Sequence, residues 1–384
     1  MTDRMTRSGQ ARWRVVGVLL SVAIACLAVV VVVTADDSAE PDDADRTEES
    51  MPTRIGYVPY WDQRRALEVV SQRPDMFDQV SVVWYSLDPS GRIVRTDDTY
   101  TNINRPAVRS MQARGIDVIP TVTNLRNGDW NVDIVQKMLH DPAARRTHIR
   151  ELVELARTEG YDGLDVDYED LSGDDRTAYT QFLTELGDEL HAAGKVLTTA
   201  VHPKTSNAGY DDRNLAQNYR AIGAAVDQVR VMTYDYSWDT SPPGPVAPAA
   251  WVEKVIAWTV TQIPRDKVVL GIDLMGYNWS GGRGVTVDHR HAQTLADKHR
   301  ATVHRSEDGT PWFTYRDSSG DRHEVWYEDA RSASAKLELV SEYDLGGVFF
   351  WRLGGEDSKV WSATRAALEN DQMTPRSGTK GGGR

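Results

Sequence analysis

The sequence predicts an α/β domain of the TIM (β/α)8-barrel class over residues 53–370. Strand-like and helix-like patterns alternate eight times in this stretch, which indicates parallel β/α units. Its length of about 320 residues is long for one domain but ordinary for such a barrel. A doubly wound sheet is the rival fold, but it needs a glycine-rich phosphate-binding turn after an early strand, and the sequence has none.

The predicted barrel strands are short runs rich in β-branched and aromatic residues. They lie at residues 54–60, 79–86, 117–123, 163–168, 196–201, 228–234, 267–273 and 347–351. Runs with apolar residues at helical spacing separate them, most clearly at 143–158, 174–193, 215–226, 248–262, 328–342 and 358–370. Because function collects at the C-terminal ends of barrel strands, the residues at these ends are the candidates for a site.

One long gap breaks the alternation between the seventh strand and the helix that begins near residue 328. It spans about 50 residues, too many for an ordinary loop. The gap contains the segments TPWFTYRD at 310–317 and RHEVWYED at 322–329, which are rich in aromatic residues. The sequence therefore predicts a small β-rich insertion at about 278–327, after the seventh strand.

The N-terminal region predicts a membrane anchor. Residues 15–35 are an uncharged apolar run, long enough to cross a bilayer as a helix, and four Arg precede it. The positive-inside rule then puts residues 1–14 in the cytoplasm and the predicted barrel domain outside the cell membrane. Residues 36–52 read as an acidic, disordered linker, and residues 371–384 read as a disordered tail.

A cleaved signal peptide is the alternative to this anchor. Val33-Thr34-Ala35 offers a cleavage site, and cleavage would make the protein secreted, but the run is longer than a usual signal core. Cys26, the only cysteine, also allows a lipoprotein interpretation. Ala23 is a poor residue three places before a lipidated cysteine, and the apolar run continues well past it.

Composition limits the classes of partner. The net charge of −13 argues against nucleic acid, and we expect a monomer. Twelve Trp and 15 Tyr, against 5 Phe, suit stacking on sugars. His202 belongs to no His, Cys or acid cluster with ligand spacing, so we predict neither a catalytic metal nor another cofactor.

The most informative segment is DGLDVDYE at residues 162–169. In a strand, alternate side chains share a face, so Asp165, Asp167 and Glu169 project the same way. Like charges that close cannot all ionise, and at least one pKa must rise. A carboxylic acid that stays protonated near neutral pH is what cleavage of a glycosidic bond needs. An acidic edge strand or a calcium-binding loop is the alternative interpretation.

This octapeptide resembles the D-G-x-D-x-D-x-E signature of glycoside hydrolase family 18, the chitinase-like family. The resemblance runs from about residue 53 to about residue 369, and it implies a TIM barrel with the signature on the fourth strand. It also implies that Glu169 is the proton donor, that Asp167 orients the acetamido group of the substrate, and that Asp165 supports Asp167.

The sixth strand carries a second resemblance, in Met232-x-Tyr234-Asp235. It implies that the Tyr234 hydroxyl binds the N-acetyl group and that Asp235 contacts the sugar near the scissile bond. Trp351 corresponds to the strand-eight tryptophan that forms the floor of the reacting subsite. The remaining expected substrate-binding residues stand at or near strand ends: Tyr57, Trp84, Met232 and Tyr277. Asp273 stands where relatives often have proline, and we leave it out of the catalytic set.

The resemblance implies a retaining, substrate-assisted hydrolase of glycans that contain N-acetylglucosamine. The segments PGPVAP at 243–248, WVEK at 251–254 and VWYED at 325–329 resemble the bacterial spore-cortex-lytic N-acetylglucosaminidase branch. Peptidoglycan is therefore the expected substrate, and chitin-type oligosaccharides are the alternative. A lectin-like barrel without catalysis is a further alternative, although such members usually lack the last Glu of the signature.

Overall fold

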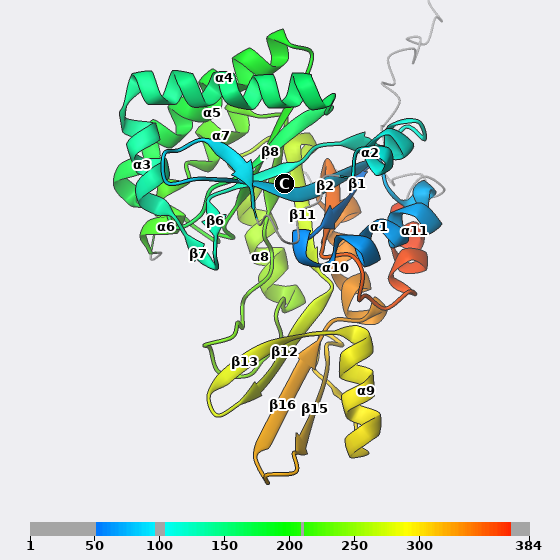
Figure 1. The fold of residues 1–384 in the computed structure, drawn as a ribbon. Helices are drawn as coiled ribbons and strands as arrows, with labels where there is room; N and C mark the ends of the chain where they lie inside the picture. The colour runs from blue at the N-terminus through cyan, green and yellow to red at the C-terminus, as the bar shows by residue number, and fades with distance from the viewer. Residues whose placement is uncertain (1–50, 97–103, 209–210, 370–384) are drawn as a thin grey trace, which may run out of the picture. The chain divides into compact units, whose positions relative to one another are not determined.

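The computed structural model describes residues 51–96, 104–208 and 211–369, which contain a closed barrel of eight parallel strands (Figure 1). Neighbouring strands pair in the order β1-β2-β5-β8-β9-β10-β11-β17, and β17 pairs with β1 to close the ring. The barrel class predicted from the alternation is thus confirmed. The barrel strands are β1 (Thr53–Val58), β2 (Gln79–Leu87), β5 (Thr121–Thr123), β8 (Gly163–Asp167), β9 (Val196–Val201), β10 (Gln228–Val231), β11 (Val268–Asp273) and β17 (Gly347–Trp351).

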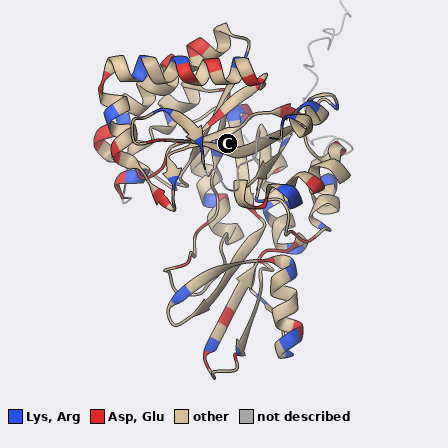
Figure 2. Cartoon of the chain, in the orientation of Figure 1, with Lys and Arg blue, Asp and Glu red and all other residues tan. Residues whose placement is uncertain are grey.

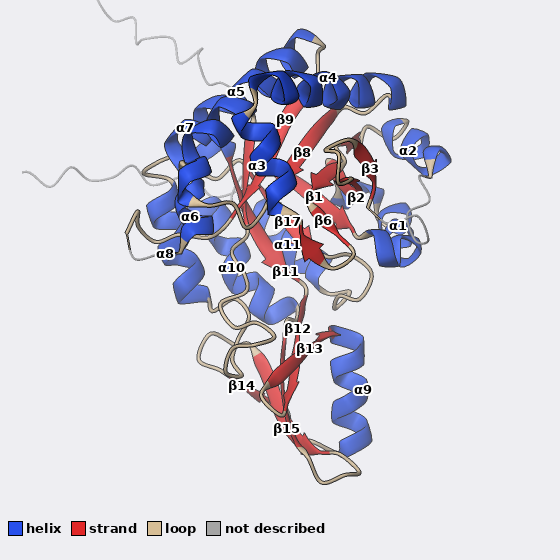
Figure 3. Ribbon diagram, turned by 60° about the vertical axis from the view of Figure 1, so that its left-hand side comes forward, coloured by secondary structure: helices blue, strands red, loops and turns tan. Residues whose placement is uncertain are grey.

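Helices surround the strands on the outside, as the turned view in Figure 3 makes plain. They are α1 (Gln63–Gln72), α2 (Arg105–Gln112), α3 (Val132–His140), α4 (Pro142–Glu159), α5 (Arg176–Ala192), α6 (Asp212–Ala216), α7 (Tyr219–Ala225), α8 (Ala249–Thr259), α10 (Ala330–Glu342) and α11 (Val360–Glu369). Short 3-10 turns η1 (Tyr60–Asp62), η2 (Pro74–Met76), η3 (Gly173–Asp175) and η4 (Arg265–Lys267) and short strands β3 (Ile93–Arg95), β4 (Asp117–Val118), β6 (Leu125–Arg126) and β7 (Asp129–Trp130) complete the barrel region.

The helix α4 has clear start and stop signals in the sequence. The Asp141 carboxylate accepts hydrogen bonds from the backbone N–H groups of Ala143 and Ala144, and Pro142 occupies the first turn, where its missing N–H costs nothing. Gly160 ends the helix with a left-handed φ of 72°. The helix is therefore fixed at both ends before the chain enters β8.

Charges of both signs are spread over the outer helices (Figure 2). On α4, Arg145 pairs with Glu185 of α5 at 2.9 Å. The exposed Arg157 pairs with Glu154 one turn away at 2.8 Å. An exposed pair contributes only about 0–1 kcal/mol. The continuous apolar core between helices and strands therefore carries most of the stability.

The insertion after β11 forms an antiparallel sheet in the order β13-β12-β16-β15-β14. Its elements are β12 (Met275–Ser280), β13 (Arg283–Asp288), α9 (His289–His299), β14 (His304–Arg305), β15 (Pro311–Arg316) and β16 (Arg322–Tyr327). The strands agree with the expected β-rich insertion, whereas α9 was not expected. The helix covers one face of this sheet and encloses a small core of its own, with Phe313 and Val325 at its centre.

The predicted anchor at 15–35, the cytoplasmic tail at 1–14, the linker at 36–52 apart from its last two residues, and the tail at 371–384 lie outside the described residues. None of the helices that the structure does describe is long and apolar enough to cross a lipid bilayer.

Candidate active site

Three acidic residues stand at the C-terminal end of β8. Asp165 lies within the strand and Asp167 ends it, opposite Thr123 of β5 in the last pair of the ladder. Glu169 lies two residues beyond the strand, where hydrogen bonds from the Asn124 side chain replace the backbone pairing between strands. The Glu169 N–H donates to Asn124 Oδ1 at 2.9 Å, and Asn124 Nδ2 donates to the Glu169 carbonyl at 3.0 Å. This two-point clamp fixes the main chain from which the Glu169 side chain projects.

Asp165 is fully buried inside the barrel and surrounded by donors. Its carboxylate accepts hydrogen bonds from the Tyr57 hydroxyl at 2.8 Å, from Thr121 at 2.9 Å and from Thr198 at 2.7 Å. The buried guanidinium of Arg230 lies 3.5 Å from the same carboxylate and also donates to the Tyr57 hydroxyl at 3.0 Å. Three hydrogen bonds and a neighbouring cation thus hold the Asp165 carboxylate in place inside the barrel.

The environments of Asp167 and Glu169 favour the protonated form of each acid. Loss of hydration and the charge of Asp165 raise the pKa of Asp167 to about 7. Burial, followed by the charges of Asp167, Asp170 and Asp235, raises the pKa of Glu169 well above its ordinary value. This agrees with the expectation that the acid ladder must retain a proton. Glu169 can therefore act as a proton donor at neutral pH, beside Asp167, whose own pKa lies near neutral pH.

The end of β10 and the insertion meet beside these acids. Tyr234 is nearly buried and packs edge-on against Phe349, with 6.1 Å between ring centroids. Asp235, in a left-handed backbone conformation, accepts a hydrogen bond from the Tyr277 hydroxyl at 3.1 Å. The structure thus brings together Asp235 and Tyr277, two predicted substrate-binding residues 42 positions apart in sequence.

Aromatic rings line the opposite side, at the ends of β1 and β17. Trp351 is half-buried, with its ring centroid 5.8 Å from that of Tyr57 and 6.2 Å from that of Trp61. Trp61 is 42% exposed, and the guanidinium of Arg352 lies over its ring, 5.4 Å from the centroid. Met232, which directly follows β10, is half-buried and packs against the main core.

Trp84 corrects the expectation from the sequence. Its side chain is fully buried in the main core, so it offers no surface to a glycan in this structure. An aromatic residue near a strand end can point into the barrel wall as readily as toward the mouth, and the sequence pattern alone did not separate the two.

The comparison with known families decides the class of this site. The family model described as glycosyl hydrolases family 18 matches residues 53–356. The chain belongs to this family.

Two curated relatives come from Bacillus subtilis (strain 168). One is the protein YdhD, a glycosylase linked by its name to sporulation, which is 34% identical over 297 residues that cover 74% of this chain and 68% of YdhD. The other is a cortical fragment-lytic enzyme, 35% identical over 257 residues that cover 65% of this chain and 60% of the enzyme. The chain thus spans about three fifths of that enzyme's length.

A solved structure has the same fold. The crystal structure of a chitinase from Chromobacterium violaceum ATCC 12472 superposes with a TM-score of 0.76 at 30% identity, covering 83% of this chain and 99% of the chitinase. The protein is therefore a family 18 glycosidase, related both to cortex-lytic enzymes and to chitinases.

The family 18 site contains one residue that sequence analysis set aside. His202 follows β9, and its Nε2 atom lies 3.6 Å from Glu169 Oε2. The two residues are 33 positions apart, and only the parallel pairing of β8 with β9 brings them together. Two aromatic residues beyond β10, Tyr236 and Trp238, are exposed.

Asp273 ends β11 and is buried rather than presented to a substrate. Its Oδ1 atom accepts a hydrogen bond from the Met275 N–H at 2.9 Å, and burial raises its pKa well above the ordinary value. This local contact joins the end of the barrel strand to the start of β12.

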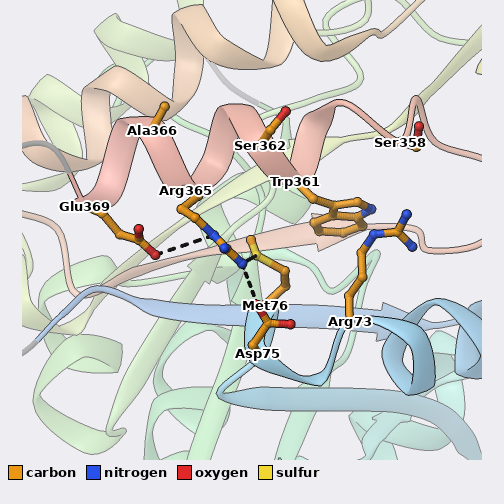
Figure 4. Close-up of a pocket in the computed structure, with 9 residues that line it drawn as sticks. All are labelled: Arg73, Asp75, Met76, Ser358, Trp361, Ser362, Arg365, Ala366 and Glu369. Carbon is orange, nitrogen blue, oxygen red and sulfur yellow. Dashed lines mark hydrogen bonds and ion pairs between the residues drawn. The ribbon is translucent and has the colours of Figure 1, made fainter.

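The part of the chain that the structure describes contains no group of three or more His, Cys, Asp or Glu arranged to hold a metal ion. A pocket of about 570 Å³ lies elsewhere, between η2 and α11 (Figure 4). There Arg365 pairs with Asp75 at 2.5 Å and with Glu369 at 3.7 Å. Because none of the signature acids lines it, this pocket is not the family 18 site.

Proposed function

We propose that this glycosidase cleaves β-1,4 bonds after N-acetylglucosamine in peptidoglycan, by a retaining, substrate-assisted mechanism. The observation that carries the proposal is the contrast between two acids at one strand end. The pKa of Glu169 is raised, whereas the Asp165 carboxylate accepts three hydrogen bonds. An ordinary retaining glycosidase needs a second carboxylate across the bond, about 5–5.5 Å from the acid. Asp167 instead precedes Glu169 by two residues, about 7 Å along the chain if it stays extended, and comes from the same side.

Substrate assistance supplies the missing nucleophile. Glu169 gives its proton to the leaving glycosidic oxygen while the acetamido oxygen of the substrate attacks the anomeric carbon and forms an oxazolinium ion. Asp167 accepts a hydrogen bond from the acetamido N–H and stabilises the positive charge, and the Tyr234 hydroxyl holds the acetamido oxygen. Glu169, now a carboxylate, takes a proton from water, and the hydroxide opens the oxazolinium ring with net retention.

Two observations support peptidoglycan as the substrate. The chain is 34–35% identical to YdhD and to a cortical fragment-lytic enzyme. The predicted anchor at 15–35 would also hold the domain outside the cell membrane, beneath the wall. The chitinase of Chromobacterium violaceum, at 30% identity, favours chitin-type oligosaccharides as the second candidate. A lectin-like barrel is disfavoured by the presence of Glu169 and its raised pKa.

The deciding experiment identifies the new reducing end. The purified chain is incubated with peptidoglycan and, separately, with chitooligosaccharides, and the products are reduced with borohydride. Reduced N-acetylglucosamine from peptidoglycan is the expected result, and Glu169→Gln is the inactive control. Reduced muramic acid, or cleavage of chitooligosaccharides alone, would overturn the assignment to peptidoglycan. A thiazoline mimic of the oxazolinium ion should inhibit, and lack of inhibition would exclude the substrate-assisted step.

A further inference from the structure

His202 has an unusual environment for a buried histidine. Its Nε2 atom is buried and has no hydrogen-bond partner among the described residues, yet it lies 3.6 Å from the carboxylate of Glu169. A histidine that merely fills a core normally satisfies its ring nitrogens with a stable partner. Here the nearest acceptor is the proton-transferring group of the active site.

The backbone N–H and carbonyl groups of His202 are both held by hydrogen bonds. The His202 N–H donates to Gln217 Oε1 at 2.7 Å, and the His202 carbonyl accepts a hydrogen bond from the Tyr219 hydroxyl. The residue is only 7% exposed. The ring is thus held next to Glu169 by contacts that do not use its own nitrogen atoms.

The ring is also uncharged at neutral pH. Burial is the main cause that lowers the pKa of His202 to about 4; the charges of Arg213 and Lys204 act in the same direction, and the charge of Asp211 opposes them. A neutral imidazole has one N–H group, and the hydrogen can reside on either nitrogen. Such a ring can donate to a carboxylate without acting as a permanent cation, which would force Glu169 to lose its proton before the reaction.

We propose that His202 is a positioning residue for Glu169, and that its Nε2–H donates a hydrogen bond to the carboxylate formed when Glu169 has delivered its proton. The inference rests on the proposed function, because it assumes that Glu169 is the acid. The contact of 3.6 Å is too long for a hydrogen bond in the present state. Catalytic hydrogen bonds are often long without substrate and shorten in the reacting complex.

This bond has two consequences for the reaction. Together with the charge of Arg213, it favours the anion against repulsion from Asp167, Asp170 and Asp235, so it limits how far the pKa of Glu169 rises. It also holds one carboxylate oxygen, which leaves the other to face the glycosidic oxygen and then the attacking water. Loss of the N–H should therefore move the alkaline limb of the pH profile upward and slow turnover.

The test uses two variants that separate the N–H group from the ring. His202→Phe keeps a ring without an N–H, whereas His202→Gln keeps an N–H without the ring. The dependence of kcat/KM on pH is measured with peptidoglycan or tetra-N-acetylchitotetraose, whichever the unmodified chain cleaves. In His202→Phe the alkaline limb should rise by about one pH unit, with kcat lowered about tenfold, as for a hydrogen bond to a charged group. In His202→Gln the limb should stay near its original position.

A second measurement does not depend on turnover. The carboxyl carbon of Glu169 is titrated by NMR in the unmodified chain and in His202→Phe, and its pKa should be higher in the variant. Thermal unfolding midpoints establish that both variants fold. If neither the alkaline limb nor the pKa of Glu169 moved in His202→Phe, the role of His202 would be overturned. A shift of either to lower pH would also overturn it, because Glu169 would then be the hydrogen-bond donor. An unmodified chain without activity would overturn the proposed function, while the NMR comparison would still decide the contact.

Discussion

At the scale of single residues, the raised pKa values of Asp167 and Glu169 lower the stability of the folded chain at neutral and alkaline pH. The pKa of Asp167 is about 7 in the folded chain and 3.8 without perturbation, so the folded state binds its proton more tightly than the unfolded state does. The stability that this proton confers is fully present below about pH 4 and is lost as the pH rises through about 7. Glu169, whose pKa is also raised, acts in the same direction.

The first prediction follows from this sign. Asp167→Asn removes a group that must be desolvated when charged, so the variant should be more stable than the unmodified chain at pH 8. The gain should disappear near pH 4, where Asp167 is already neutral. Activity should be almost abolished, because the charge that faces the oxazolinium ion is gone. Thermal midpoints at both pH values provide the check, and an equal gain at pH 4 and pH 8 would contradict the argument.

Arg230 carries the second prediction at this scale. Its side chain and that of Asp165 are both fully buried, with 3.5 Å between them. Arg230→Met leaves the Asp165 charge without a cation inside the barrel, and breaking such a pair costs about 3–5 kcal/mol. The matched control is Arg157→Met, in an exposed pair worth about 0–1 kcal/mol. Urea unfolding measures both, and similar losses would show that Arg230 has no special role.

These residues also mark what the sequence can predict about a site. Asp165, Asp167 and Glu169 could be found because they alternate with apolar residues within one short segment, although the strand itself ends at Asp167. His202, Asn124 and Arg230 could not, because each acquires its role from a neighbouring strand or from the barrel interior. Trp84 was misassigned for a related reason, since a pattern of aromatic residues does not reveal which of them the core will bury.

At the scale of elements, the alternation predicted every barrel strand, and local chemistry shifted the boundaries. The third strand is interrupted after β4, where Pro120 has no N–H to continue the ladder. The sixth strand stops at Val231 rather than Tyr234. The helix α9 escaped prediction because most of its residues are polar and its two buried residues, Ala292 and Ala296, are small.

The strand β8 carries the third prediction. A side chain at Gly163 would place its Cβ atom 2.4 Å from the Val196 carbonyl oxygen of β9, closer than real atoms approach. Gly163→Ala should therefore push β8 away from β9, destabilise the barrel and displace Glu169, with a loss of kcat larger than the change in KM. Gly173→Ala is the control, because its nearest neighbour would be 3.5 Å away. Unchanged kcat and stability in Gly163→Ala would disprove this account.

At the scale of the whole molecule, the barrel separates the start of the chain's domain from its chemistry. All eight barrel strands are parallel, so their N-terminal ends share one rim and their C-terminal ends share the other. β1 begins at Thr53 on the first rim, whereas Asp167 and Glu169 stand on the second. Thr53 and the two acids thus lie at opposite ends of the barrel.

The last prediction concerns attachment to the membrane. We expect the apolar run at 15–35 to stay uncleaved, with the linker at 36–52 spanning about 20–25 Å as a flexible chain. The full chain should then sediment with membranes, and protease added to intact cells should release a fragment that begins within residues 36–52. Cys26→Ser is the control, because an anchored chain keeps its membrane attachment whereas a lipoprotein loses it. A mature N-terminus at Asp36 in the medium would show that the run is a cleaved signal, and the glycosidase would then act as a secreted enzyme.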